Sequence, residues 1–214
     1  MKSEEVLKRL EDSMVSLDYD QVVEGSKEIL ETGIDPTDAA RALTSGIRKV
    51  GEKYEKGEYF LSELLMAGEI INAGMEILSP ALKGAGERRL AKVVICTVKG
   101  DLHDIGKNLA KMLLASEGFD VFDLGVDVDA MKIVEKVRES GTQIVGLSAL
   151  LSTTIPYIGD VTHALKEARI RDSLKVIAGG AALDENTATR FGADAYAADA
   201  VKGARICVEW EGKR

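Results

Sequence analysis

The spacing of apolar residues divides the sequence into two parts. Up to about residue 80, apolar positions recur every three or four residues, which is the spacing of amphipathic helices. We expect four helices there, with apolar positions spread over residues 6–17, 22–30, 39–54 and 61–78. Because short turns join them, the prediction for this part is a small up-down four-helix bundle.

Short signals mark the expected ends of these helices. Asp35 followed by Pro36 is typical of an N-cap residue and the first residue of a helix. Gly33 and Gly57 are expected to close the second and third helices, and Ser79-Pro80 to end the fourth.

Four glycines lie inside the predicted helices, at Gly46, Gly51, Gly68 and Gly74. Each costs about 1 kcal/mol relative to alanine, so an opposing gain is expected. Two explanations remain open. The helices approach one another closely at these positions, or the missing side chains leave room for a bulky ligand against the bundle.

After residue 82 the pattern changes. A polar, glycine-containing segment over 83–92 is expected to be a linker, and short apolar strands then alternate with amphipathic helices. Strands are predicted at 93–98, 121–124, 144–148, 176–178 and 195–197, and helices at about 106–117, 129–140, 156–169, 184–191 and 200–210. Such alternation predicts a parallel sheet covered on both faces, with right-handed crossovers.

The expected fold class is therefore α/β. An N-terminal four-helix bundle precedes a flavodoxin-like or Rossmann-like five-stranded parallel sheet of strand order 2-1-3-4-5. We place the domain boundary in the polar linker, which gives a helical domain over residues 1–88 and an α/β domain over residues 89–214.

The composition excludes several classes of protein. A net charge of -8 and a pI near 5.0 argue against a broad nucleic-acid surface. No apolar run approaches the roughly 20 residues that a membrane helix needs, and the charged N-terminus is expected to fold as a helix instead of serving as a signal peptide. Cys96 and Cys207 lack CxxC spacing, so reduced, packed thiols are expected. We expect a cytoplasmic protein that binds neither nucleic acid nor membrane.

Polar residues of an unusual kind follow three of the predicted strands. In a sheet of this order the ligand crevice lies beyond the carboxyl ends of the strands, between the first and the third. The loop after the first strand reads KGDLHDIG and holds His103, one of 2 histidines in the chain. Hydroxyl side chains follow the third strand, at Ser148, Ser152, Thr153 and Thr154, and Gly179-Gly180 follows the fourth.

The motifs that this edge lacks limit the kind of ligand. It has neither GxGxxG nor a Walker-type loop, and only Lys99 and Lys107 bring positive charge near the first loop. Phosphate groups of dinucleotides or nucleoside triphosphates are therefore not favoured. Glycines and hydroxyls together favour a wide, mostly neutral ligand that is pressed against backbone and oriented by a few hydrogen bonds.

His103 allows three explanations. It could cap the following helix or bond a neighbouring carboxylate. It could bind zinc, although no cysteine or second histidine stands at a suitable spacing. Finally, it could be the single axial ligand of a metal whose other positions come from a macrocycle, with Asp101 holding its second ring nitrogen.

Three short motifs, in this order, resemble the signature of cobalamin-binding domains of the methionine synthase and methylmalonyl-CoA mutase type. That signature is Asp-x-His-x-x-Gly, then Ser-x-Leu, then Gly-Gly. Here it reads Asp101-Leu102-His103-Asp104-Ile105-Gly106, Ser148-Ala149-Leu150 and Gly179-Gly180. A helical bundle directly before such a domain resembles the corrinoid proteins of methanogens and acetogens, and residues 57–80 are similar to their bundle segment.

The resemblance implies a role for each motif. His103 would be the catalytic lower ligand of cobalt, displacing the cofactor's own nucleotide base, and Asp101 would accept a hydrogen bond from its other ring nitrogen. Gly106 would admit the displaced nucleotide tail. Ser148 and Leu150 would line the slot for the base, and Gly179-Gly180 would pack on the tail.

In methionine synthase two further hydroxyl residues follow the signature serine, and the second completes the Asp–His relay. Ser152 and Thr154 stand at those places here, and Thr153 stays an alternative. The cofactor-binding set implied by the resemblance is Asp101, His103, Asp104, Ile105, Gly106, Ser148, Leu150, Ser152, Thr153, Thr154, Gly179 and Gly180.

The resemblance also implies a function. The chain would be a corrinoid subunit, not catalytic alone, that carries a methyl group on cobalamin or a related corrinoid, cycling between cob(I)alamin and methylcobalamin. Expected partners are a substrate-specific methyltransferase with a methylamine, methanol or methoxylated-aromatic donor, an acceptor-side methyltransferase serving a thiol or tetrahydrofolate-type acceptor, and a reductive activase.

In such proteins the bundle caps the upper face of the corrin, so we expect two domain arrangements, hinged near residues 84–89. A cobalamin-dependent mutase subunit, a cobalamin-sensing regulator and a corrinoid storage protein remain alternatives.

Overall fold

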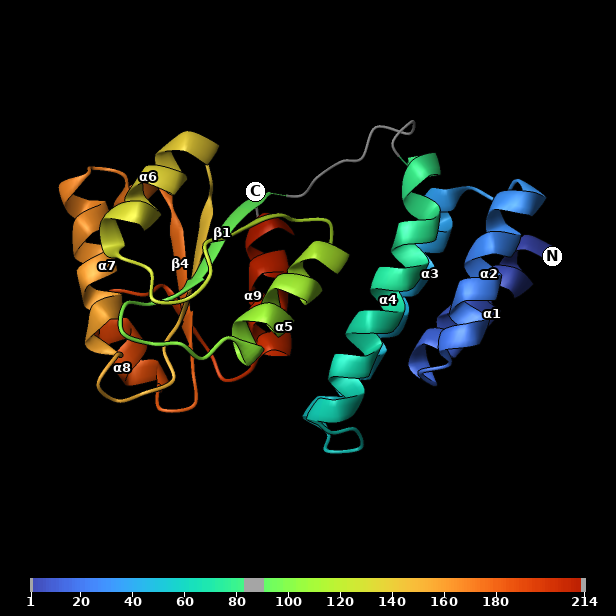
Figure 1. Cartoon of the computed structure of the whole chain (residues 1–214), viewed down its shortest axis with the longest axis horizontal. Helices are drawn as coiled ribbons and strands as arrows, with labels where there is room; N and C mark the ends of the chain where they lie inside the picture. The colour runs from blue at the N-terminus through green and yellow to red at the C-terminus, as the bar shows by residue number, and fades with distance from the viewer. Residues whose placement is uncertain (1, 83–90, 213–214) are drawn as a thin grey trace. The chain divides into compact units, whose positions relative to one another are not determined.

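The computed structural model describes residues 2–82 and 91–212, and the chain divides into two compact units, Met1–Arg88 and Arg89–Arg214 (Figure 1). The predicted linker over 83–92 and the predicted hinge over 84–89 lie largely or wholly outside the described residues. Among the described helices, none combines the length and apolar character that a membrane span requires.

The first unit contains the four predicted helices. They are α1 (Lys2–Val15), α2 (Tyr19–Thr32), α3 (Pro36–Glu55) and α4 (Leu61–Leu82). Asp35 caps α3 as predicted, because its side chain accepts a hydrogen bond from the Thr37 amide at 2.8 Å. Gly33 ends α2 in the left-handed conformation, at φ 70.

The predicted end of α4 at Ser79-Pro80 was wrong, because the helix continues through Pro80 to Leu82. A proline lacks one backbone N–H and crowds the preceding turn. In the last described turn of the helix this removes one hydrogen bond and leaves the earlier turns intact.

The glycines of the bundle explain how closely the helices pack. A Cβ at Gly46 of α3 would lie 2.6 Å from the Cβ of Met14 in α1. A Cβ at Gly74 of α4 would lie 2.8 Å from a methyl carbon of Leu43 and 3.1 Å from one of Val22. Of the two explanations for these glycines, close contact between helices is confirmed at both positions.

The second unit has the predicted α/β architecture. Strands β1 (Lys92–Thr97), β2 (Asp120–Asp123), β3 (Ile144–Ser148), β4 (Lys175–Gly179) and β5 (Ala195–Ala197) pair in parallel, in the order β2-β1-β3-β4-β5. The helices are α5 (Ile105–Ser116), α6 (Ala130–Ser140), α7 (Pro156–Glu167), α8 (Glu185–Arg190) and α9 (Ala200–Gly212), with a 3₁₀ turn at Arg171–Ser173. The predicted strand order is confirmed.

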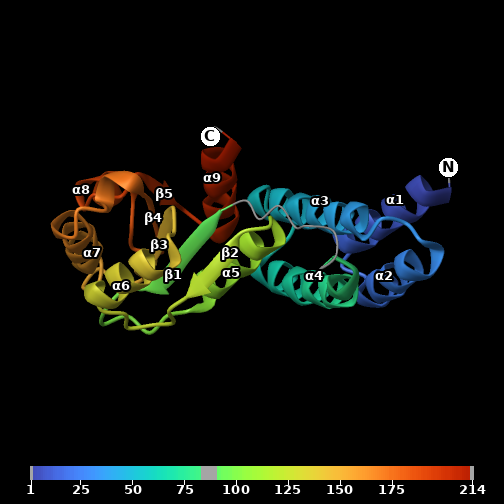
Figure 2. The same ribbon diagram turned by 90° about the horizontal axis from the view of Figure 1, so that it is seen from above.

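The two faces of this sheet are packed differently. Helices α6, α7 and α8 cover one face, where Val94, Cys96, Val145, Leu147 and Val176 belong to a buried apolar cluster (Figures 1 and 2). Helices α5 and α9 pack together on the other face (Figure 2). Because side chains alternate along a strand, the residues after Cys96 and Leu147 point toward α5 and α9.

Replacement of Gly46 by alanine should destabilise the bundle. Helix propensity alone favours alanine by about 1 kcal/mol, but the new methyl group would overlap the Met14 side chain, and overpacking costs about 1–3 kcal/mol. We therefore expect a net loss of stability in urea unfolding followed by far-UV circular dichroism.

The control for this variant is Gly212→Ala in α9, where nothing lies within 4 Å of the added Cβ. Its free energy of unfolding should be equal to that of the parent protein or higher, because the greater helix propensity of alanine is not opposed by a clash there. A Gly46→Ala protein as stable as this control would contradict close packing as the reason for the glycine.

Candidate functional site

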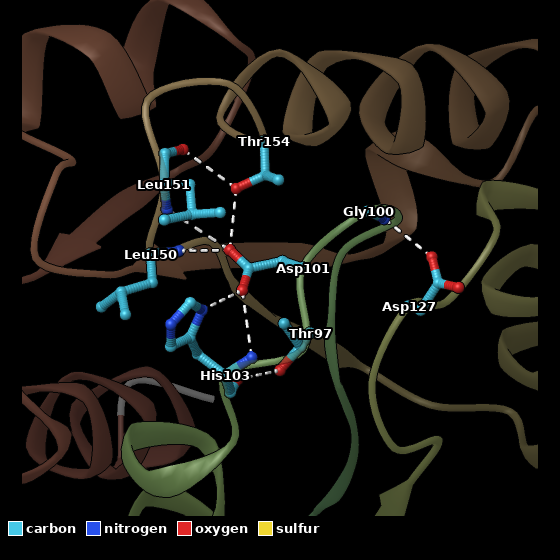
Figure 3. Close-up of polar contacts among 8 residues, drawn as sticks. All are labelled: Thr97, Gly100, Asp101, His103, Asp127, Leu150, Leu151 and Thr154. Carbon is cyan, nitrogen blue, oxygen red and sulfur yellow. Dashed lines mark hydrogen bonds and ion pairs between the residues drawn. The ribbon is translucent and has the colours of Figure 1, made fainter.

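The loop between β1 and α5 lies at the carboxyl edge of the sheet and is tied to it by hydrogen bonds. The Gly100 amide donates to Oδ1 of Asp127 at 2.7 Å (Figure 3). The Asp127 amide donates to the carbonyl of Asp101 at 3.0 Å. Thr97, the last residue of β1, donates from its hydroxyl to the carbonyl of His103 at 2.9 Å. Gly100 has φ +78, a conformation that favours glycine.

Asp101 is the centre of the hydrogen-bond network in this loop. Its side chain is fully buried, and its Oδ1 lies 2.7 Å from Nδ1 of His103 and accepts from the His103 amide at 3.1 Å. Its Oδ2 accepts from the Leu150 amide at 2.7 Å and from the Thr154 hydroxyl at 2.8 Å (Figure 3). The carboxylate therefore joins the loop after β1 to the segment after β3.

These donors keep Asp101 ionised. Burial by itself would raise the pKa of the carboxyl, but the hydrogen bonds from His103, Thr154 and Leu150 outweigh it and hold the pKa well below the ordinary value of 3.8. A fifth donor, the Leu151 amide, lies 3.4 Å from Oδ2. A buried carboxylate with these donors is stable as an anion, because each of its lone-pair directions has a partner.

His103 is oriented by this anion. Its Nδ1 faces Asp101, and its side chain is 52% exposed, so Nε2 remains for a ligand. A neutral imidazole with its proton on Nδ1 presents a lone pair at Nε2. Of the explanations considered for His103, the bond to a neighbouring carboxylate is confirmed, and this bond is also what a metal-binding histidine requires. Asp104, not His103, occupies the N-cap position of α5.

The described side chains around His103 do not form a zinc site. In residues 2–82 and 91–212, no group of three or more His, Cys, Asp and Glu side chains is placed to hold a metal ion. An axial role for His103 needs only one protein ligand, and its geometry is consistent with that role.

Small side chains form a row beside His103 on the α5 and α9 face of the sheet. Strand register aligns Thr97, Ser148, Gly179 and Ala197 across β1, β3, β4 and β5. Gly106, in the first turn of α5, has nothing within 4 Å of the position of a Cβ. Exposed apolar side chains stand around the histidine, with Leu102 72%, Ile105 59% and Leu151 42% exposed. The edge therefore offers one imidazole nitrogen, apolar surface and space for a bulky group.

Gly180 also makes a contact within the protein that the sequence did not indicate. A Cβ there would lie 1.9 Å from the carbonyl oxygen of Ala149, and its φ is +148. Only glycine allows the end of β4 to lie this close to the segment that follows β3. That segment carries the Leu150 amide, so Gly180 helps to bring a donor to Asp101.

The other predicted site residues fall into two groups. Ser148, Leu150 and Gly179 are partly buried at the edge, whereas Asp104, Ile105, Ser152 and Thr153 are exposed. Of the three hydroxyl residues considered for the relay, Thr154 is the one that bonds Asp101. Sequence reasoning missed Thr97 and Asp127, because nothing in their local sequence signals a bond to a loop residue elsewhere.

The chain is similar to known proteins in both of its units. The model of the B12 binding domain family matches residues 91–205, and a second B12 binding domain model matches residues 6–79. Trimethylamine corrinoid protein 1 of Methanosarcina acetivorans is 38% identical over 196 residues, which are 90% of this chain and 91% of that protein. Dimethylamine corrinoid protein 2 of the same organism is 39% identical over 202 residues, 92% of each.

Solved structures show the same relationship. A cobalamin-binding protein from Desulfitobacterium hafniense DCB-2 superposes with a TM-score of 0.83 at 39% identity, over 95% of this chain and 98% of that one. A chain of the methanol:cobalamin methyltransferase complex MtaBC from Methanosarcina barkeri has a TM-score of 0.84 at 28% identity, over 98% of this chain and 81% of that one. The chain therefore belongs to the B12 binding domain family, is a relative of the methanogen corrinoid proteins, and binds cobalamin or a related corrinoid.

Proposed function

We propose that this protein is a methyl carrier, which receives a methyl group from one methyltransferase and presents it to another. The observation that carries the proposal is the Thr154–Asp101–His103 relay, which leaves Nε2 of a half-exposed imidazole at the carboxyl edge of the sheet. When bound, the corrinoid supplies a cobalt atom that can accept and release a methyl group.

The relay would control how strongly His103 binds the metal. Asp101 accepts the Nδ1 proton, which fixes the tautomer and makes Nε2 a better donor. Thr154 and the Leu150 amide hold the second carboxylate oxygen, so the carboxylate cannot rotate away from the ring. An imidazole held in this way would keep its orientation whether or not it is bound to the metal.

The row of small residues would receive the nucleotide tail of the cofactor. If His103 holds the metal, the nucleotide base of the cofactor would be displaced and would need space in the protein near His103. Gly106 has open space at its Cβ position, and Ser148 and Gly179 lie in the same row on the face covered by α5 and α9. We assign Ser148 and Leu150 to the slot for the base, and Gly179-Gly180 to the tail. The exposed Asp104, Ile105, Ser152 and Thr153 would contact the cofactor at its rim.

The relatives favour particular partners. Those named above are called trimethylamine and dimethylamine corrinoid proteins, and one similar structure comes from a methanol:cobalamin methyltransferase complex. We propose a methyltransferase specific for a methylated amine as the donor-side partner, with methanol and methoxylated aromatics as alternatives. An acceptor-side methyltransferase and a reductive activase complete the system, and the helical unit 1–88 would shield the reactive face of the cofactor.

The function can be tested by methyl transfer. Full-length protein reconstituted with hydroxocobalamin and reduced should accept methyl groups in the presence of a trimethylamine or dimethylamine methyltransferase, and His103→Ala should do so roughly 10–100-fold more slowly. His163→Ala is the control, because His163 lies exposed on α7 at 74%. A protein that keeps its methyl group and passes it to no acceptor would be a storage protein instead.

The relay predicts a loss for one change at Thr154 and almost no effect for another. Thr154→Val keeps the shape but removes the hydroxyl that donates to the buried carboxylate, and we expect a loss of about 1.5–3 kcal/mol in apoprotein stability. It should also lower corrinoid affinity. Thr154→Ser keeps the hydroxyl and should stay close to the parent protein in both. Equal effects of the two variants, in urea unfolding and in binding titrations followed by visible absorbance, would argue against the relay.

The open space at Gly106 predicts an effect on corrinoid binding without an effect on stability. Gly106→Leu adds a side chain to open space, so the apoprotein should remain as stable as the parent. The same side chain would block the tail and should weaken hydroxocobalamin binding by at least about tenfold, or roughly 1.4 kcal/mol. Gly106→Ala should give a smaller loss. Unchanged affinity in Gly106→Leu would place the tail elsewhere.

A further inference from the structure

Lys107, directly after Gly106, is a buried cation that the proposed mechanism does not use. Its side chain is 3% exposed, and its Nζ lies 2.8 Å from each oxygen of Asp123 and 2.6 Å from Oδ1 of Asn108. Lysine is almost never fully buried unless it is paired. Asp123, the last residue of β2, is 16% exposed. The pair therefore ties the first turn of α5 to the carboxyl end of β2.

This tie compensates for a missing helix cap. Among the described residues, five other helices begin at an aspartate whose side chain accepts a hydrogen bond from a backbone amide of the first turn, namely Asp18, Asp35, Asp129, Asp184 and Asp199. Asp104, the N-cap residue of α5, makes no such bond. Its carboxylate instead accepts from the side-chain amide of Asn108 at 3.0 Å. The start of α5, which follows His103 directly, is thus held by side chains of the next turn.

A chain of hydrogen bonds also connects Asp123 to His103 through Gly125 and Thr97. Its Oδ1 accepts from the Gly125 amide at 2.9 Å, and the Gly125 carbonyl accepts from the Thr97 amide at 3.0 Å. Thr97 in turn donates to the carbonyl of His103. One carboxylate therefore connects to the residues before His103 through the strand end and to the residues after it through the helix.

The carboxyl group of Asp123 is ionised in the folded protein. Burial alone would raise the pKa of the Asp123 carboxyl, but the hydrogen bonds from Lys107, Gly125 and Lys111 lower it overall. An ionised carboxylate holds the ammonium group in one geometry, because both oxygens are engaged at 2.8 Å.

We propose that Lys107 and Asp123 are positioning residues for His103. The pair fixes both ends of the loop that carries the imidazole, so that Nε2 lies where a metal can reach it. This inference rests on the proposed role of His103 as an axial ligand. A purely structural pair would affect stability alone, whereas a positioning pair also changes how His103 binds and how its ring is held by Asp101.

The test compares two lysines that share one carboxylate. Lys107→Met removes the buried partner of Asp123, and Lys111→Met removes the partner that is 48% exposed, at 3.2 Å. Full-length proteins are titrated with hydroxocobalamin and then reduced to the cobalt(II) state. Electron paramagnetic resonance reports the axial nitrogen through its superhyperfine splitting, which changes when the protein is ¹⁵N-labelled if the nitrogen belongs to the protein.

We expect Lys107→Met to weaken binding at least about tenfold, as loss of an outer ligand-supporting group does. The protein-derived nitrogen splitting should also decrease, and Lys111→Met should match the parent protein. Arg171→Met controls for loss of a mostly buried ion pair, because Arg171 and Asp194 are 12% and 27% exposed and lie at the amino ends of β4 and β5. It should lower stability without changing the axial signal.

A second readout needs no cofactor. In the apoprotein, the ¹⁵N chemical shifts of the His103 ring report its tautomer, and Lys107→Met should reduce the Nδ1-protonated form while Lys111→Met should not. If Lys107→Met does not fold, Asp123→Asn, which keeps the shape and the bond from Gly125, gives the same test. A folded variant with parental affinity, axial signal and ring shifts overturns the proposal. Parent protein without a protein-derived axial nitrogen overturns the role of His103 itself.

Discussion

The arrangement of the site depends on one buried carboxylate. Asp101 accepts hydrogen bonds from His103 on one oxygen and from Leu150 and Thr154 on the other. A buried anion is costly unless all its lone pairs are satisfied. The loops after β1 and β3 must therefore stay together for the anion to be stable, and the imidazole is oriented as a consequence. Gly180 also helps to keep these loops together, since only glycine allows Ala149 to approach it.

The two faces of the sheet carry side chains of different size. Branched and aromatic side chains fill the face under α6, α7 and α8. On the face under α5 and α9, small residues align near the carboxyl ends of four strands. Close packing explains one of them, because a Cβ at Gly179 would lie 3.0 Å from the carbonyl oxygen of Ala197. At Gly106 nothing lies within 4 Å of an added Cβ, so the open space is at the start of α5.

Much of this architecture could be predicted from local patterns. The Asp35-Pro36 helix start, the strand order and the Asp101–Gly106 loop depend on residues that are close in sequence or on rules of connection between neighbouring elements. The predicted end of α4 was wrong because a proline near a helix terminus removes only one hydrogen bond and does not have to end the helix. The relay partner could not be chosen among Ser152, Thr153 and Thr154, because adjacent hydroxyl residues differ only in the direction in which the turn points them.

By itself, the sequence determined the two-part organisation, the parallel sheet and the identity of the motifs that mark a corrinoid site, because periodicity and short signatures are local properties. Only the tertiary structure decided that Thr154 completes the relay, that Thr97 and Asp127 hold the loop, and that Lys107 pairs with Asp123. These contacts join residues from separate strands and loops. Their geometry depends on strand register and on the angle of each turn, neither of which can be read from residue types along the chain.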